Sequence, residues 1–306
     1  MIYSSKLYLS AVLILSAVPA LAAPLGVAAD YNVFVLGSIN QANTDIEGRA
    51  AVGGSAQFSN FGIGTTLSPN SSRLDLIVGG SLTYINGQIH NGSGVYAGSG
   101  SISGVGVPNG TLTQAPSPID FVAAGQALIA ESDGYAALAA VAVAAQYGGL
   151  NLVGTDANLN IFYVAAGTLA SLNSLSISAP VGSTVLVNVA GATNSFTNAG
   201  MSVSGTNRQN VLFNFFETTS LTMSGMGFQG SILAPEAAFQ FNNGQINGNI
   251  VVASMQGGGE SHNTLFTGQL PPWDPGTDVP EPATWLCTGA GFALVALGAI
   301  RRRKNS

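Results

Sequence analysis

The chain has 306 residues, of which 46% are hydrophobic and only 7% are charged, while 40 are glycine, close to twice the usual share. So few charges exclude long charged helices and coiled coils, and so much apolar sequence excludes a disordered acidic tail. Between residues 23 and 278 there are three arginines, thirteen acidic residues and no lysine, a net charge of −10. Such a body repels phosphate backbones and anionic lipid, which excludes a nucleic-acid-binding protein.

Residues 1–22 have the pattern of an export signal. Lys6 precedes an apolar run over residues 7–18, and Pro19-Ala20-Leu21-Ala22 has the small residues of a cleavage site. We therefore expect a secretory signal peptide over residues 1–22, cleaved after Ala22 rather than directly before Pro24. The alternative, an uncleaved N-terminal anchor, is disfavoured because the apolar run is too short to span a membrane comfortably.

The body, residues 23–270, consists mainly of short stretches in which apolar and polar residues alternate, bounded by Gly, Asn or Ser. Alternation of this kind predicts β-strands separated by turns. The predicted strands are residues 50–55, 74–83, 175–177, 184–189, 211–216, 230–234 and 248–253.

Short sequences recur within this body. Val52-Gly53-Gly54-Ser55 returns as residues 78–81, Gly230-Ser231-Ile232-Leu233 returns in similar form as residues 248–251, and Asn86-Gly87-Gln88-Ile89 returns as residues 243–246. Periods near 20 residues predict a mainly β fold, an irregular right-handed β-solenoid in which glycine and asparagine form the corners. The alternative, an antiparallel sandwich, is disfavoured because Asn-Gly hairpins between matched strands are scarce.

One segment of the body differs from the rest. Residues 119–146 are rich in alanine, follow Pro116-Ser117-Pro118 and end at Gly148-Gly149, which predicts one long α-helix that Gly134 could divide in two. Because this helix is too apolar to stand in water, we expect it to pack alongside the solenoid and cover its core.

The C-terminal region has three parts. Residues 271–278 form a Pro/Gly linker, residues 283–300 are apolar enough for a transmembrane helix, and the basic tail at residues 301–304 would stay in the cytoplasm. This order puts the body outside the inner membrane. The single cysteine, Cys287, lies in the apolar part, so the body has no disulfide.

The order of motif, apolar helix and arginine cluster in residues 279–306 resembles the PEP-CTERM sorting signal of Gram-negative bacteria. The sorting residues that the resemblance implies are Val279, Pro280, Glu281, Pro282, Arg301, Arg302 and Arg303. It further implies recognition by an exosortase, removal of the helix, and release to the cell surface or an exopolysaccharide matrix. Without the resemblance, these residues indicate a single-pass tail anchor.

The body is similar to the choice-of-anchor A domain of bacterial surface proteins. The residues that carry this similarity are 48–54, 119–121, 230–235, 243–248, 259–260, 262–263 and 266–268. The resemblance implies an adhesive domain with a solenoid like that of bacterial ice-binding proteins, and it implies no catalytic residues.

The residues themselves give little support to an enzyme. A polysaccharide lyase needs a basic residue, and the body offers no lysine and only Arg49, Arg73 and Arg208. Asp45 and Glu47 alternate as a hydrolase pair could, but a solvated acidic edge is the simpler interpretation.

The other chemical patterns are also weak. His90 and His262 could not complete a metal site without carboxylates, and we interpret His262 as a residue that holds the last coil in place. Gly225-Met226-Gly227-Phe228-Gln229-Gly230 matches the dinucleotide fingerprint only by letter, because a strand rather than a helix follows it. No segment has the aspartate spacing of a calcium loop, and we predict neither metal nor cofactor.

What remains is an uncharged surface of Ser, Thr, Asn and Gln. Residues 176–178, 202–204 and 222–224 place hydroxyl groups on one side and aliphatic groups on the other. Phe58, Phe61, Tyr84 and Tyr96 could add exposed aromatic rings, but we favour the alternative that each ring stacks within the core. Such arrays suit weak multivalent contacts with polysaccharide. We predict a non-enzymatic surface or extracellular-matrix protein, adhesive or exopolysaccharide-associated. The alternatives are a polysaccharide-active β-helix enzyme, hydrolase or lyase, and an ice-binding protein.

Overall fold

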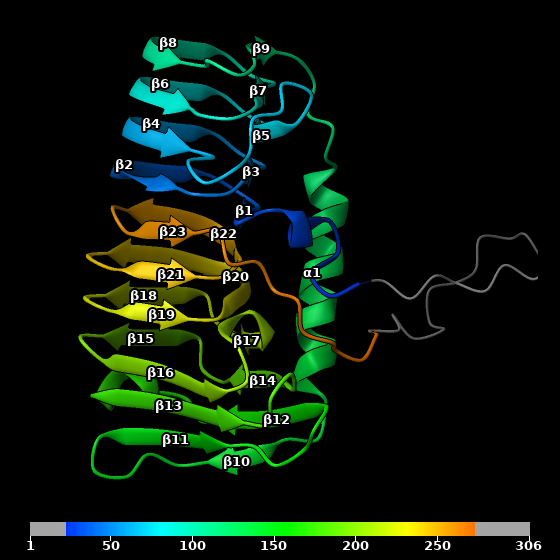
Figure 1. The fold of residues 1–306 in the computed structure, drawn as a ribbon, viewed down its shortest axis with the longest axis vertical. Coiled ribbons are helices and arrows are strands. Elements are labelled where there is room, and N and C mark those ends of the chain that lie inside the picture. The colour runs from blue at the N-terminus through cyan, green and yellow to red at the C-terminus, as the bar shows by residue number, and fades with distance from the viewer. Residues whose placement is uncertain (1–22, 273–306) are drawn as a thin grey trace, which may run out of the picture.

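The computed structural model describes residues 23–272, which form 23 strands, one α-helix and three 3-10 helices. All ladders between these strands are parallel, so the chain winds through successive coils (Figure 1). The β-solenoid is confirmed and the antiparallel sandwich is excluded, because hairpins require antiparallel neighbours. The predicted signal peptide, residues 273–278 of the linker and the predicted sorting signal lie outside the described residues.

The chain enters the stack in its middle and first builds one half. After the 3-10 helix η1 (Gly26–Asp30), strand β1 pairs with β3, and each later strand adds to the coil below it. The strands of this half are β1 (Val33–Val35), β2 (Ile39–Ile46), β3 (Ala50–Val52), β4 (Ala56–Ile63), β5 (Leu74–Val78), β6 (Leu82–Ile89), β7 (Ser93–Tyr96), β8 (Gly100–Gly106) and β9 (Leu112–Gln114).

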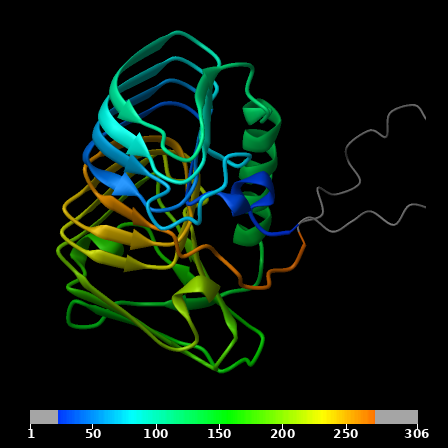
Figure 2. The same cartoon turned by 45° about the horizontal axis from the view of Figure 1, so that its top comes forward.

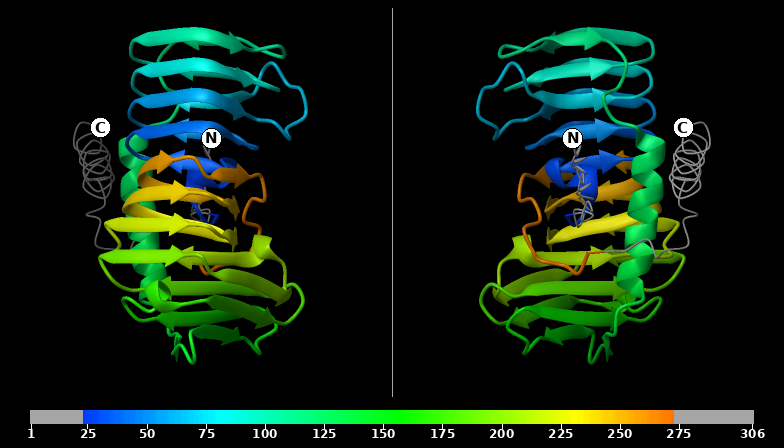
Figure 3. Two further views of the ribbon diagram at one scale, coloured as in Figure 1. Left: turned by 90° about the vertical axis from the view of Figure 1, so that its left-hand side faces the viewer. Right: turned by 90° about the vertical axis from the view of Figure 1, so that its right-hand side faces the viewer.

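Helix α1 (Phe121–Ala136) then runs along the stack to its opposite end, where the second half begins (Figure 3). The lower strands of this half are β10 (Val141–Val143), β11 (Gly149–Val153), β12 (Leu159–Val164), β13 (Ser174–Ala179), β14 (Thr184–Val189), β15 (Thr193–Thr197) and β16 (Gly200–Gly205). The later strands are β17 (Val211–Asn214), β18 (Ser220–Ser224), β19 (Gly227–Gln229), β20 (Ser231–Asn242), β21 (Gln245–Asn247), β22 (Ile250–Gly257) and β23 (Glu260–His262), and two further 3-10 helices are η2 (Leu169–Ser171) and η3 (Arg208–Asn210).

The second half builds back toward the middle and closes on the first. Strand β22 pairs with β1 and with the start of β2, and β23 pairs with the end of β2. We call this junction of the last strands with the first the seam. It joins residues from the two ends of the described chain in adjacent coils.

The coils have three sides, so the stack has three faces (Figure 2). The helix face, which α1 covers, contains β1, β3, β5, β7 and β9, with β10, β12, β14, β17 and the first parts of β20 and β22. The polar face contains the first parts of β2, β4, β6 and β8, with β15, β18 and the second parts of β20 and β22. The third face contains the second parts of β2, β4, β6 and β8, with β11, β13, β16, β19, β21 and β23.

The core lies between the three faces and is built from inward side chains in register. On the helix face Ile232, Ile250, Val33, Ala50 and Leu76 pair in succession across the seam, and all are fully buried. Burial of such aliphatic ladders contributes about 1.5–3 kcal/mol per large side chain. The recurrence of residues 52–55 and 230–233 is therefore confirmed as coil-to-coil alignment.

The corner between the polar face and the third face explains the recurring asparagines. Asn43, Asn60 and Asn86 occupy this corner in successive coils with φ of 59°, 49° and 52°, and Asn60 Nδ2 donates to Asn43 Oδ1 at 2.9 Å. Asn243, the counterpart of Asn86 in its repeat, has φ of 50°. Asparagine tolerates this left-handed conformation because its amide bonds locally. The predicted Asn and Gly corners are confirmed.

The helix starts where the sequence predicts and ends earlier. Asp120 caps α1 by accepting from the backbone N–H groups of Val122 and Ala123, but α1 ends at Ala136, not at residue 146, and Gly134 does not divide it. Residues 141–143 form β10, which pairs with β12. The prediction was wrong here because hydrogen bonds along the edge of the lowest coil outweigh the helix propensity of alanine.

The predicted position of the helix beside the solenoid is confirmed. Leu128 and Tyr135 of α1 are buried against the outward side chains of the helix face, which include Leu212 and Leu233. Polar contacts fix the same interface, since Asn214 Nδ2 donates to the carbonyl of Ser132 at 2.8 Å.

Within residues 23–272, no helix combines the length and hydropathy needed to cross a membrane. The predicted transmembrane helix, residues 283–300, lies outside the described part of the chain.

Candidate functional site

The polar face presents rows of side chains that run along the stack. Because strands pair in register about 4.8 Å apart, outward residues at equivalent positions align. The first row is Thr193, Ser220, Ala238, Ser254, Ser38, Ser55, Ser81 and Ser99, and the second is Ser195, Thr222, Gln240, Gln256, Asn40, Gln57, Thr83 and Ser101. All sixteen are exposed or half-buried, and none is charged.

Hydrogen bonds between coils order the part of the first row that lies in the first half of the solenoid. Ser38 Oγ accepts from the backbone N–H of Ser55, Ser55 Oγ from that of Ser81, and Ser81 Oγ from that of Ser99, at 3.2 to 3.3 Å. The hydroxyls of Ser38, Ser55 and Ser81 thus each have a fixed neighbour, which reduces the rotamer freedom that binding would remove.

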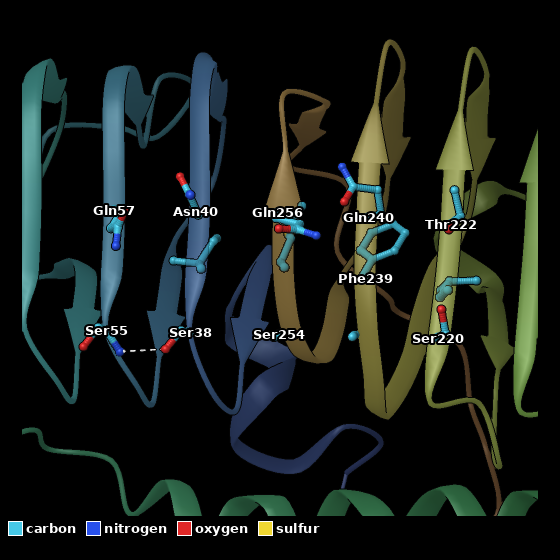
Figure 4. Close-up of a pocket in the computed structure, with 14 residues that line it drawn as sticks. Ser38, Asn40, Ser55, Gln57, Ser220, Thr222, Phe239, Gln240, Ser254 and Gln256 are labelled. Atoms are coloured by element: carbon cyan, nitrogen blue, oxygen red, sulfur yellow. Dashed lines mark hydrogen bonds between the residues drawn. The ribbon is translucent and has the colours of Figure 1, made fainter.

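A shallow groove of about 570 Å³ crosses the polar face at the seam. Its lining comes from β2 and β4 of the first half and from β18, β20 and β22 of the second. Figure 4 shows Asn40, Gln57, Gln240 and Gln256 in one row, with the serines of the other row beside them. Ala238 lies in the serine row and lacks a polar side chain, so the groove combines amide and hydroxyl groups with an apolar floor.

The favoured burial of the aromatic rings is confirmed at three of four positions. Phe58, Phe61 and Tyr84 are buried in the core, and Tyr96 is half-buried. Phe58 and Phe61 stack at 4.7 Å between centroids, and the Tyr84 hydroxyl donates to the carbonyl of Phe61 at 2.8 Å. Burial raises the pKa of the Tyr84 hydroxyl, so it stays a hydrogen-bond donor. These rings fill the solenoid because they occupy inward positions of the alternating strands.

The sequence patterns at 176–178, 202–204 and 222–224 behave as predicted. Ile177 and Met223 are buried, and the hydroxyl residues beside them point outward. Gly225 and Gly230, with φ of 65° and 137°, bound strand β19, which confirms a glycine corner instead of a dinucleotide loop.

The third face gathers acidic residues at the seam. Asp45 lies near the end of β2, where its Oδ2 accepts from Thr65 Oγ1 at 2.9 Å, and Glu47 follows the strand. Pairing of Ile46 with Ser261 brings Glu47 close to Glu260 and His262 of β23. We call Glu47, Glu260 and His262 the seam cluster. One oxygen from each carboxylate and one ring nitrogen all lie within 4.8 Å of one another, and the three residues are half-buried.

The two histidines are not brought together. His90 follows β6, with its Nδ1 3.1 Å from Gln88 Nε2, whereas His262 Nδ1 lies 3.0 Å from Asn247 Oδ1 and its Nε2 3.4 Å from Glu260 Oε1. The role of His262 in holding the last coil agrees with these contacts. Sequence reasoning missed the seam cluster because Glu47 meets β23 only through closure of the stack.

One buried carboxylate lies away from both features. Glu131 of α1 accepts from the Tyr135 hydroxyl at 2.6 Å and from the backbone N–H of Leu25 at 2.8 Å. Burial raises the pKa of Glu131, while these two hydrogen bonds oppose the shift. The contacts tie the first described residues to the helix, so this carboxylate has a structural role. The predicted sorting residues 279–282 and 301–303 lie outside the described residues.

A parallel solenoid with an uncharged, regularly spaced polar face has the architecture of a surface-binding domain. The family model described as "Putative Ice-binding-like adhesive domain" matches residues 24–263. The chain therefore belongs to this family of ice-binding-like adhesive domains, which confirms the adhesive part of the predicted resemblance. No curated protein matches the chain.

Solved structures similar to this chain include several ice-binding proteins. One from an Antarctic biological consortium is 15% identical, with 84% of this chain and 96% of that chain covered and a TM-score of 0.40. One from the Antarctic ascomycete Antarctomyces psychrotrophicus is 14% identical, with coverages of 82% and 100% and a TM-score of 0.37. Ice-binding protein 1 of Shewanella frigidimarina is 14% identical, with coverages of 82% and 99% and a TM-score of 0.38. The fold described here follows from the strand pairing itself.

Proposed function

We propose that this protein is a non-enzymatic surface adhesive whose polar face binds a neutral polysaccharide. The observation that supports this most strongly is the pair of uncharged rows with the groove at their centre. Polysaccharide presents mainly hydroxyl groups, and an array of amides and hydroxyls can donate to and accept from them at many points. Contacts of this kind are individually weak and gain strength through multivalency.

The groove is large enough for several sugar units. Its five strands, spaced about 4.8 Å apart, extend about 19 Å along the stack. The amides of Gln240 and Gln256 lie beside the apolar floor at Ala238, which suits a sugar ring with polar edges and an apolar side. An enzyme that cleaves polysaccharide would need paired acid and base groups in this groove. The groove lining offers only Ser, Thr, Asn, Gln and apolar residues.

The ends of the described chain leave the polar face free. Leu25, near the start, and Phe266 and Leu270, near the end, pack in the apolar cluster beneath α1 on the helix face. An anchor attached beyond residue 272 would therefore start from the side that α1 occupies (Figure 1). The polar face is then accessible to matrix material.

Binding can be tested with the chain immobilised and exposed to dextran, cellulose and exopolysaccharide from the producing cells. We expect retention of at least one neutral polysaccharide, and an affinity at least tenfold lower when Gln240→Glu and Gln57→Glu place charges in the groove. Ser202→Glu, at an exposed position of β16 on the third face, is the matched control and should bind as the wild type does. Release of new reducing ends or unsaturated sugars would instead establish a hydrolase or lyase, and no retention on any glycan or cell would refute adhesion.

A second candidate function is ice binding, which the regular spacing of hydroxyl groups in the first row favours. The second row carries four long amide side chains, which makes the face less flat than rows of threonine would be. Thermal hysteresis and ice shaping by the purified chain decide between the two. Hysteresis that Ser220→Glu in the first row abolishes, without glycan retention, would support ice as the ligand.

We also propose that the chain is exported and sorted through residues 279–306. This second proposal is supported by the sequence of the C-terminal region. Val279-Pro280-Glu281-Pro282 is followed by an apolar stretch and then by basic residues, and this order resembles a PEP-CTERM signal. An exosortase would remove the tail and release the body from the inner membrane to the surface or matrix. Fractionation of producing cells tests this, because deletion of the exosortase should hold the chain in the inner-membrane fraction. Equal release with and without the exosortase would contradict it.

A further inference from the structure

We propose that the seam cluster of Glu47, Glu260 and His262 binds one divalent metal ion of the zinc class, and that this ion fastens the last strand of the solenoid to its first coil. This site lies on the third face, apart from the groove of the polar face. It requires no assumption about the ligand of that groove.

The ligand set and its spacing fit such an ion. Zinc takes imidazole nitrogen and carboxylate oxygen at about 2.0–2.2 Å in tetrahedral geometry, which sets neighbouring ligand atoms about 3.3–3.5 Å apart. His262 Nε2 and Glu260 Oε1 are 3.4 Å apart. Because all three ligand atoms lie within 4.8 Å of one another, rotation of the Glu47 side chain brings its oxygen to the same ion.

Hydrogen bonds around His262 present the correct nitrogen. Asn247 Nδ2 donates to the carbonyl of Phe228 at 3.1 Å, so Asn247 Oδ1 faces His262 Nδ1 at 3.0 Å and accepts a hydrogen bond from the Nδ1–H group. In the neutral ring, Nε2 then carries the lone pair and faces a carboxylate oxygen that also only accepts. A cation between these two acceptor atoms can bind the lone pairs of both. The hydrogen bond from Nδ1 is the outer-shell contact that metal-bound histidines commonly make.

The charge at the site favours a divalent ion over a proton. A proton on His262 Nε2 would neutralise the negative charge of one of the two carboxylates, whereas a divalent ion would neutralise the charges of both. Within residues 23–272, neither Glu47 nor Glu260 forms an ion pair with an arginine, since Arg49 pairs with Asp30 and Arg73 with Asp75. The imidazole ligand favours zinc over calcium, which takes six to eight oxygen ligands.

The ion would act where the first and last coils are weakly joined. On the third face β2 and β23 share only the pair Ile46 and Ser261, with Glu47 N–H donating to the carbonyl of Ser261 at 2.9 Å. Gln41 Oε1 and Ser261 Oγ, both buried at this seam, have no hydrogen-bond partner among the described residues. A ligand bridge between Glu47 and β23 closes a loop of about two hundred residues and thereby restricts opening of the seam.

The first experiment measures zinc binding to the 306-residue chain, purified in detergent and stripped with EDTA. We expect one zinc per chain after gel filtration, and affinity at least tenfold weaker in Glu260→Gln and in Glu47→Gln. His90→Gln is the matched control and should bind zinc as the wild type does. A wild-type chain that retains no zinc at micromolar concentration, or a Glu260→Gln chain that binds it equally well, overturns the proposal.

A second measurement does not depend on altering the cluster. The chain has two histidines, so ring nitrogen resonances of a histidine-labelled sample are few and His90→Gln assigns them. Zinc should shift Nε2 of His262 and leave His90 unchanged. A shift confined to His90 would place the zinc at that residue, and a His262 ring protonated on both nitrogens and insensitive to zinc would mean that a proton and not a metal bridges the pair. Either result overturns the proposal.

Discussion

Replacement of Asn214 by alanine should weaken the attachment of α1 and lower the free energy of unfolding by about 3–5 kcal/mol. Asn214 is fully buried, its Nδ2 donates to the carbonyl of Ser132 at 2.8 Å and to Asn188 Oδ1 at 2.9 Å, and its Oδ1 accepts from Ser132 Oγ. Alanine leaves two acceptors and one donor buried without these partners. Each such group costs about 1–3 kcal/mol, and partial relaxation keeps the total in the lower half of the summed range.

Urea unfolding followed by circular dichroism measures the loss, and hydrogen exchange of the α1 amides shows where it acts. We expect faster exchange in α1 of Asn214→Ala than in the wild type. Asn40→Ala, at an exposed asparagine of the polar face, is the control and should change stability by less than about 0.5 kcal/mol. A loss below about 1 kcal/mol, with unchanged protection of α1, would refute the role assigned to this hydrogen-bond network.

Three further substitutions test other parts of the fold. Burial raises the pKa of Glu131 above its ordinary value of 4.5, so its stabilising contribution is full below the unfolded-state pKa and is lost as pH rises through the folded-state pKa. The free energy of unfolding relative to Glu131→Gln should therefore fall as pH rises above 4.5, and a pH-independent difference would contradict this. Asn86→Val should cost about 1–2 kcal/mol in thermal unfolding because φ is 52°, whereas Asn86→Gly should cost far less, and equal losses would count against conformational strain. Arg73→Ala should lower the free energy of unfolding in urea by about 3–5 kcal/mol, because it leaves the buried carboxylate of Asp75 without its partner at 2.6 Å. The exposed control Arg208→Ala should not show this loss.

The solenoid could be predicted because each coil carries its own signal. Alternation in residues 184–189 and the aligned repeats at residues 52–55 and 78–81 each report local structure, and corner asparagines mark the turns. The end of the helix could not be predicted in this way. Residues 141–143 have the composition of the preceding helix, and only the strand that lies beside them, β12, makes them extended.

The groove and the seam cluster depended on information that no segment contains. Glu47 and Asn263, whose backbone N–H donates to that carboxylate at 2.9 Å, are 216 residues apart, and their contact follows from the order in which the two halves stack. The aromatic residues, in contrast, could be placed from the sequence. Ala56 and Leu82 point inward, and side chains alternate between the two sides of a strand. Phe58 and Tyr84, two residues further along the same strands, therefore also point into the core.

The seam relates the groove to the seam cluster. Residues of β2 and β22 line the groove on the polar face, while Glu47 after β2 and the two ligands on β23 lie on the adjacent third face. Any opening of the seam separates Asn40 from Gln256 as well as Glu47 from Glu260, because each pair crosses the same junction. An ion at the cluster would therefore preserve the spacing of the groove's side chains without touching a ligand there. If both proposals hold, EDTA should weaken polysaccharide binding by the wild type and leave the already weaker binding by Glu260→Gln unchanged, whereas equal weakening of both would show that chelation acts elsewhere.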